Sequence, residues 1–225
     1  MKIAYMTDMH GNKEALERLL EVGKEKSIEA IVIGGDLCPG FEIPEQRAFL
    51  ENWLVPKLKN FTKPILLIMG NDDFSINTDI LEKADKEGVL HLLHNSAVKI
   101  GKICFAGYPY VNDVPFLIRD WLKKEQEIKN DLEQIKAPRE TIWLFHAPPY
   151  ETKLDIAWSG EHVGSTAVKD FILKEQPLAS LHGHIHESPV ISGKWKERLG
   201  NTLAINPGNE NIIILDIEKL EAKEI

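Results

Sequence analysis

Carboxylate, amide and imidazole side chains occur at five places along this chain of 225 residues, each just after a short apolar run. Imidazole and carboxylate ligands together suit Mn, Fe, Zn, Ni or Co, whereas an all-oxygen set would suit Mg or Ca. A single tetrahedral ion cannot use so many ligands, so the pattern predicts two ions that share a carboxylate. The candidate ligands are Asp8, His10, Asp36, Asn71, His146, His184 and His186.

The apolar runs have the length and composition of buried strands, because they are short and rich in Ile, Val and Leu. Amphipathic helix patterns at 14–26 and 44–61 separate the first three runs, which predicts right-handed crossovers and a largely parallel sheet. The carboxyl ends of the strands in such a sheet share one rim, where side chains distant in sequence can meet. The five runs are Lys2–Thr7, Ala30–Gly34, Pro64–Met69, Thr141–Phe145 and Pro177–Leu181.

The remaining segments predict shorter strands and one long helix. A helix is expected over about Pro115–Lys136, where apolar residues recur on one side. A meander is expected over Val89–Leu93, Ala97–Ile100 and Lys102–Ala106, and antiparallel strands are expected at 189–195, 198–206 and 211–217. The whole pattern favours one α/β domain over residues 1–225, with two β-sheets and the helices outside them.

The charge balance limits the classes of partner. Lys and Arg number 27 and Asp and Glu number 35, which gives a net charge of −8 and argues against an extended nucleic-acid surface. Cys38 and Cys104 show no pairing motif, so we expect a reducing compartment. Neither a secretion signal nor an apolar run of about 20 residues occurs. We therefore expect a cytoplasmic protein without a membrane partner, and the sequence leaves its oligomeric state open.

The order and approximate spacing of the motifs resemble those of the calcineurin-like metallophosphoesterase superfamily, in its small phosphodiesterase-like branch. The motifs are Asp8-x-His10, Gly35-Asp36, Gly70-Asn71-x-Asp73, His146 and Gly183-His184-x-His186. The resemblance implies a two-sheet β-sandwich flanked by helices, a four-layer αββα fold. It also implies that one ion is held by Asp8, His10, Asp36 and His186, and the other by Asp36, Asn71, His146 and His184, with Asp36 as the bridge.

Two divalent ions would outweigh the charges of Asp8 and Asp36 and leave about +2 at the site, which would attract a phosphate group to an acidic chain. The expected reaction is hydrolysis of a small phosphate ester by metal-bound hydroxide, with two ions ~3.5–4 Å apart. The substrate would be a phosphodiester, or a monoester with a good leaving group. The sequence does not choose among Mn, Fe, Zn and Ni.

Three further residues are candidates for roles around the ions. Asp72 stands where many superfamily members have a histidine that assists the leaving group. An aspartate beside two cations stays ionised and is a poor proton donor, so esters with good leaving groups would be preferred over alkyl monoesters. The alternative is that Asp72 only caps a turn. Asn12 and His162 are candidates for substrate binding, although helix capping is the commoner role of an Asn at the position of Asn12, and capping or loop packing is the commoner role of a residue such as His162.

Two alternative functions remain. One is a non-catalytic interaction scaffold on the same fold, as in a retromer subunit of the superfamily whose metal site is degraded. The complete set of ligand types argues against it. The other is a nuclease, which the acidic net charge disfavours.

Overall fold

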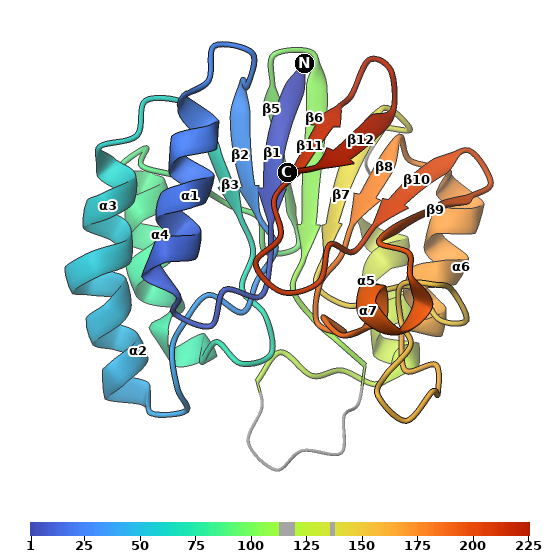
Figure 1. Cartoon of the computed structure of the whole chain (residues 1–225). Helices are drawn as coiled ribbons and strands as arrows, with labels where there is room; N and C mark the ends of the chain where they lie inside the picture. Colours follow the sequence, from blue (N-terminus) through green and yellow to red (C-terminus); the bar gives the residue numbers. More distant parts are fainter. Residues whose placement is uncertain (113–119, 136–137) are drawn as a thin grey trace.

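The computed structural model describes residues 1–112, 120–135 and 138–225, which form two six-stranded sheets packed face to face between two layers of helices (Figure 1). This arrangement confirms the predicted α/β sandwich. Each sheet is mixed, since parallel strands form its central part and antiparallel strands complete one or both of its edges.

The first sheet contains the first three predicted strands. Its order is β12-β11-β1-β2-β3-β4, and the β1–β2, β2–β3 and β3–β4 pairs are parallel, whereas β11 runs antiparallel to both β1 and β12. The strands are β1 (Lys2–Met6), β2 (Ala30–Ile33), β3 (Ile65–Leu67), β4 (His91–Leu92), β11 (Ile213–Asp216) and β12 (Glu221–Glu224).

The second sheet contains the other two predicted ligand-bearing strands at its centre. Its order is β5-β6-β7-β8-β10-β9, with parallel pairing from β6 to β10 and antiparallel strands at both edges. The strands are β5 (Ser96–Ile100), β6 (Ile103–Tyr108), β7 (Thr141–Phe145), β8 (Ala179–Leu181), β9 (Lys196–Leu199) and β10 (Thr202–Ile205).

Helices cover the outer face of each sheet. The first sheet is covered by α1 (Lys13–Lys24), α2 (Ile43–Phe49), α3 (Val55–Lys59) and α4 (Thr78–Lys86), and the second by α5 (Glu125–Gln134) and α6 (Thr166–Glu175). A π-helical turn, η1 (Leu50–Leu54), joins α2 to α3, and a 3₁₀ turn, η2 (Ser75–Asn77), precedes α4. The π turn comes just before Pro56, which lacks the N–H that an α-helix would need there.

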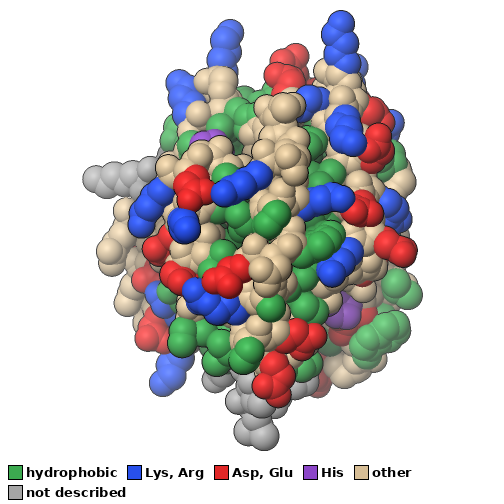
Figure 2. All heavy atoms as spheres, turned by 90° about the vertical axis from the view of Figure 1, so that its left-hand side faces the viewer, with side chains coloured by type: hydrophobic (Ala, Val, Ile, Leu, Met, Phe, Trp, Pro, Cys, Tyr) green, Lys and Arg blue, Asp and Glu red, His purple; other side chains and the backbone are tan. Residues whose placement is uncertain are grey.

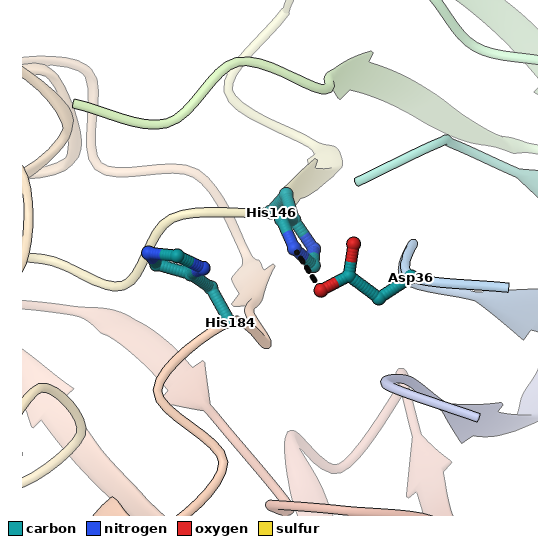
Figure 3. Close-up of side chains that lie close together, drawn as sticks. All are labelled: Asp36, His146 and His184. Carbon is teal, nitrogen blue, oxygen red and sulfur yellow. Dashed lines mark ion pairs between the residues drawn. The ribbon is translucent and has the colours of Figure 1, made fainter. Parts of the chain in front are cut away.

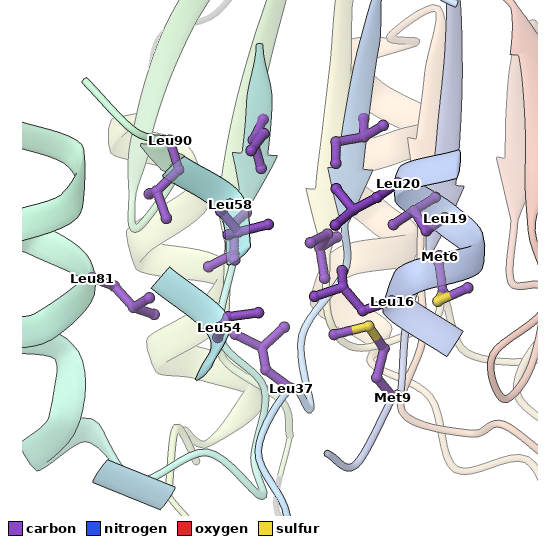
Figure 4. Close-up of a cluster of buried hydrophobic side chains, with 14 of the residues drawn as sticks. Met6, Met9, Leu16, Leu19, Leu20, Leu37, Leu54, Leu58, Leu81 and Leu90 are labelled. Atoms are coloured by element: carbon purple, nitrogen blue, oxygen red, sulfur yellow. The ribbon is translucent and has the colours of Figure 1, made fainter. Parts of the chain in front are cut away.

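Side-chain alternation along the strands creates three separate apolar layers. In β1, Ile3 and Tyr5 pack between the two sheets, whereas Ala4 and Met6 pack under the helices. Figure 4 shows the cluster under the helices, in which Leu16, Leu19 and Leu20 of α1 meet residues such as Met6. A third layer lies between the second sheet and helices α5 and α6. The strand ends that carry the candidate ligands are therefore supported on both faces.

Three sequence predictions about secondary structure are wrong. The helix expected from Pro115 begins only at Glu125, because Trp121 has a φ of 54° and Leu122 forms a bridge with Val111. Residues 115–119 and 136 of that predicted helix lie outside the described residues.

The strand expected at 189–195 is instead the short helix α7 (Ser188–Ser192). Pro189 suits its first turn, and Gly193 ends it in the left-handed conformation. The segment Val89–Leu93 forms β4 of the first sheet rather than part of the meander, which is the β5–β6 hairpin with its turn at Gly101.

Both cysteines, Cys38 and Cys104, are free thiols. Within the described part of the chain, no helix has the length and apolar character needed to cross a lipid bilayer.

Candidate metal centre

The candidate ligands meet where strands of both sheets end. Each ligand group begins within four residues of the end of β1, β2, β3, β7 or β8. Among the described residues, two groups have potential ligand atoms that all lie within 4.8 Å of one another. One group is Asp36, His146 and His184, which Figure 3 shows converging from the segments after β2, β7 and β8, and the other is Asp8, His10 and Asp36. Asp36 belongs to both groups, as expected of a bridging ligand.

His146 is oriented by its two ring nitrogens. Nδ1 lies 2.9 Å from the carbonyl oxygen of Gly34, to which it donates its hydrogen in the tautomer that suits a metal ligand. Nε2 faces two oxygen atoms, Oδ1 of Asn71 at 3.1 Å and Oδ2 of Asp36 at 3.3 Å. Because Asn71 uses its Nδ2 to donate to Asp72, its oxygen is the atom turned toward His146. Three electron-pair donors thus face one another, an arrangement that requires a proton or a cation among them.

The electrostatics of the centre agree with that requirement. Burial alone would lower the pKa of His146, but the charges of Asp36 and Asp8 raise it to about 10. Burial would raise the pKa of Asp36, yet the interaction with His146 holds it below its ordinary range. Burial raises the pKa of Asp8, which is completely inaccessible to solvent. Two buried carboxylates with too little positive charge around them fit a site for divalent cations.

Backbone N–H groups orient the two carboxylates. The amide of His184 donates to both oxygens of Asp8, at 3.1 and 3.2 Å. The amide of Asp72 donates to Oδ1 of Asp36 at 2.8 Å. These bonds hold the carboxylates in place while leaving lone pairs directed at the centre, which is the support that ligands in metal sites usually receive.

The backbone at the centre is strained. Asp8, His10, Asp36 and His184 have φ values of 54°, 45°, 48° and 65°, in the left-handed region that non-glycine residues seldom adopt. Each such residue costs on the order of 1–3 kcal/mol, and such residues concentrate at functional sites. Four of the seven candidate ligands therefore have a backbone conformation that destabilises the fold but directs their side chains to the centre.

The glycines of the motifs leave room for the ligands. A Cβ atom on Gly70 would lie 2.3 Å from Oδ1 of Asp36 and 2.5 Å from Nε2 of His146. A Cβ atom on Gly183 would lie 2.4 Å from Oδ2 of Asp8. These distances are too short for any side chain, so the two glycines form part of the cradle around the ligand atoms.

His186 and Asp72 adjoin His10 at the more open side of the centre. The rings of His10 and His186 meet edge to face with centroids 5.9 Å apart. Oδ2 of Asp72 lies 3.7 Å from Nδ1 of His10. The structure thus brings all seven candidate ligands and Asp72 to one place, although Asn71 and His186 belong to neither of the two closest groups.

The partners of the two predicted substrate-binding residues lie outside the ligand set. Asn12 caps α1 by accepting from the amides of Glu14 and Ala15, and its Nδ2 donates to Glu210. Nδ1 of His162 lies 2.7 Å from Oδ1 of the buried Asp155. A role in substrate binding stays a prediction for both residues.

Asp73 has a role that the sequence reasoning did not assign. Its buried carboxylate accepts hydrogen bonds from the amides of Leu37, Cys38 and Gly70, and so it joins the segments that follow β2 and β3. Burial and the nearby charge of Asp36 raise the pKa of Asp73 to about 6. Its place in the Gly70-Asn71-x-Asp73 motif was the only feature of the sequence that pointed to a role for Asp73.

The sequence profile of the calcineurin-like phosphoesterases matches residues 1–188. The chain belongs to the calcineurin-like phosphoesterase family. It is therefore a metal-dependent phosphoric ester hydrolase by family, and the predicted resemblance is confirmed.

Several proteins are similar to this family member over nearly their whole length. The uncharacterized protein MJ1162 of Methanocaldococcus jannaschii is 29% identical over 227 residues, which cover 97% of this chain and 93% of that protein. The crystal structure of TT1561 of Thermus thermophilus has a TM-score of 0.75 at 18% identity, with 100% of this chain and 97% of that chain covered. A structure described as a novel archaeal phosphodiesterase has a TM-score of 0.53 at 17% identity, with 100% and 99% covered. The two structures show a shared fold.

Proposed function

We propose that this chain hydrolyses phosphodiesters, or phosphomonoesters with good leaving groups, at a pair of divalent transition-metal ions. The observation that carries the proposal is the presence of two ligand groups that share Asp36, each with two buried members and one partly buried histidine. One ion would be held by Asp8, His10, Asp36 and His186, and the other by Asp36, Asn71, His146 and His184. The mixed imidazole, amide and carboxylate set suits Mn, Fe, Zn or Ni.

Each part of the centre has a definite task in this proposal. Bound divalent ions supply a nucleophile at neutral pH and neutralise charge at phosphorus. Asp8 and Asp36 hold the ions and limit the net charge of the loaded site to about +2, which still attracts an anionic phosphate. Gly34 fixes the tautomer of His146 through its carbonyl oxygen, so that the ring presents Nε2 to the centre.

The position of Asp72 supports a preference for good leaving groups. Its carboxylate adjoins His10 and Asn71 at the edge of the centre, and its side chain is 12% exposed. Beside two cations it would remain ionised and could not protonate an alkoxide that leaves. Aryl esters and activated diesters need no such proton. The shared fold with an archaeal phosphodiesterase agrees with this substrate class.

The test compares bis-p-nitrophenyl phosphate, p-nitrophenyl phosphate and an alkyl monoester such as glycerol phosphate. We expect turnover of the two aryl esters that stops with a chelator and returns with added Mn²⁺ or another transition metal, and little turnover of the alkyl ester. His146→Gln should abolish the activity, whereas Glu82→Gln, at an exposed position on α4, should not change it. Absence of chelator-sensitive turnover in the metal-loaded wild-type protein would favour the scaffold alternative.

A further inference from the structure

Exposed apolar side chains are concentrated at the end of the molecule that holds the metal centre. In the described residues, eight large hydrophobic residues are exposed. Six of them lie within 13 residues after the end of β2, β3, β7 or β8, the strands that carry candidate ligands. They are Phe41, Ile43, Ile76, Trp158, Val190 and Ile191, with Leu173 and Ile225 elsewhere. Isolated exposed apolar residues are ordinary, but a group of them around a functional site indicates a binding surface.

The first patch consists of Phe41, Ile43 and Ile76, which are 54%, 43% and 64% exposed. Gln46 joins their segments, because its Nε2 donates to the carbonyl oxygens of Gly40 and Asp72. The patch is therefore attached directly to the segment that contains Asn71 and Asp72.

The second patch consists of Trp158, Val190 and Ile191, which are 72%, 75% and 37% exposed. Glu187 organises it, since its carboxylate accepts from the amide of Trp158 and its carbonyl oxygen accepts from the amides of Val190 and Ile191. The other carboxylate oxygen of Glu187 lies 3.9 Å from Nδ1 of His186. This patch therefore adjoins a candidate ligand.

The two patches lie on different sides of the centre. The residues of the first patch come after β2 and β3 of the first sheet, and those of the second patch come after β7 and β8 of the second sheet. The centre is formed where these strands end. Figure 1 shows α2 and α7, which begin or contain parts of the two patches, at the same lower end of the molecule and on opposite sides of it. Figure 2 shows hydrophobic side chains near the lower edge of the face over α1 to α4, with acidic side chains among them.

We propose that the two patches bind the apolar ester groups of the substrate, so that the enzyme selects phosphodiesters with alkyl or aryl chains of several carbons. This inference rests on the proposed function. A phosphorus atom at the centre would place its ester groups toward the patches, and contact would remove apolar surface from water on both partners. A protein or a second copy of the chain that covered both patches would also block the centre.

The charged neighbours of the patches support a small apolar ligand over an anionic surface. Glu42 and Glu45 are exposed beside Phe41, and Glu161 is exposed near Trp158. Lys194 is exposed near Ile191, so the second patch has charges of both signs beside it, and neither patch lies in the purely cationic surroundings that would attract nucleic acids or anionic membranes.

The experiment measures kcat/KM for a series of p-nitrophenyl alkyl phosphates, from methyl to octyl, below their micelle concentrations and with metal-loaded enzyme. Burial of each methylene against a patch should raise kcat/KM about twofold to fourfold until the patch is covered. Ile76→Ser and Trp158→Ser should each lower the octyl-to-methyl ratio several-fold. Leu173→Ser is the matched control, because Leu173 is 45% exposed on α6, outside both patches, and its loss should leave the ratio unchanged.

The outcomes separate this inference from the proposed function. A flat series in the wild-type enzyme, with chelator-sensitive turnover of the methyl ester, would overturn the role of the patches and leave the phosphodiesterase proposal intact. Loss of turnover for every ester would overturn both. If the series is flat and the patch variants lose sedimentation with phosphatidylcholine vesicles, the patches dock the enzyme on a membrane, and our proposal is wrong.

Discussion

Replacement of His10 by glycine should make the metal-free protein more stable than replacement by alanine. Both substitutions remove the imidazole and its contacts with Asp72 and His186. Only glycine also removes the strain at this position, where φ is 45°. The difference between the two variants therefore isolates the free energy stored in the backbone at the metal centre.

The expected size of the difference follows from two opposing effects. A residue with a Cβ atom costs roughly 1–2 kcal/mol in the left-handed region. Glycine loses more backbone entropy on folding, which costs about 0.5–1 kcal/mol relative to alanine. His10→Gly should therefore exceed His10→Ala in unfolding free energy by roughly 0.5–1 kcal/mol, or by about 1–4 °C in Tm for a domain of this size.

The assay is urea unfolding of both variants after treatment with a chelator, so that metal affinity does not contribute. Glu17 supplies the matched control, because it is exposed within α1, where φ is helical. There glycine should be the less stable substitution, by about 0.5–1 kcal/mol. If His10→Gly is no more stable than His10→Ala while Glu17 behaves as expected, the centre stores no backbone strain at this residue and our reasoning fails.

Three further predictions concern the room around the ligand atoms at Gly70, proton donation to the leaving group, and the pH dependence of stability. Gly70→Ala should abolish metal binding, since its Cβ would lie 2.3 Å from a carboxylate oxygen of Asp36. Gly107→Ala is the control, because its Cβ would clash with Leu93 and not with a candidate ligand, so this variant should be less stable but should keep its metals when folded. Elemental analysis of both variants would measure their metal content. Asp72→His should raise turnover of alkyl monoesters relative to aryl esters by supplying a proton donor, and steady-state kinetics in which the ratio stays constant or falls would refute the role given to Asp72. Burial lowers the pKa of His94 from 6.5 to about 4, so the unfolded chain takes up a proton that the folded one resists, and stability should fall as pH drops from about 6.5 toward 4. His94→Gln should weaken this dependence in urea unfolding of the metal-free protein, and an unchanged slope would contradict the assignment.

The sequence predicted the strands that carry ligands well, because buried parallel strands combine apolar runs with polar residues at their carboxyl ends. The convergence of the candidate ligands followed from the position of these polar residues at the strand ends. Asp36, which comes after β2, belongs to both groups of ligand atoms. The strain at Asp8 and His184 could not be predicted, since φ depends on how the loops pack against each other.

Predictions failed where tertiary contacts override local pattern. Periodicity favoured a helix through Trp121, but the indole nitrogen of Trp121 donates to the carbonyl oxygen of Asp73, and its backbone turns there. The segment around Pro189 reads as a strand by its apolar residues, yet Glu187 starts a helical turn beside the centre. The role of Asp73 was missed because nothing in a sequence shows which backbone amides a buried carboxylate will meet.

The number of metal ions that each chain binds is the most direct test of a centre for two ions that share Asp36. Elemental analysis after dialysis against Mn²⁺ or Zn²⁺ should give two equivalents for the wild-type protein and two for Glu82→Gln. Because Asp36 belongs to both ligand groups and His184 to one, Asp36→Asn should lose both ions, and His184→Ala should lose or weaken one. A wild-type protein that binds a single equivalent, or an Asp36→Asn variant that retains two, would contradict the account.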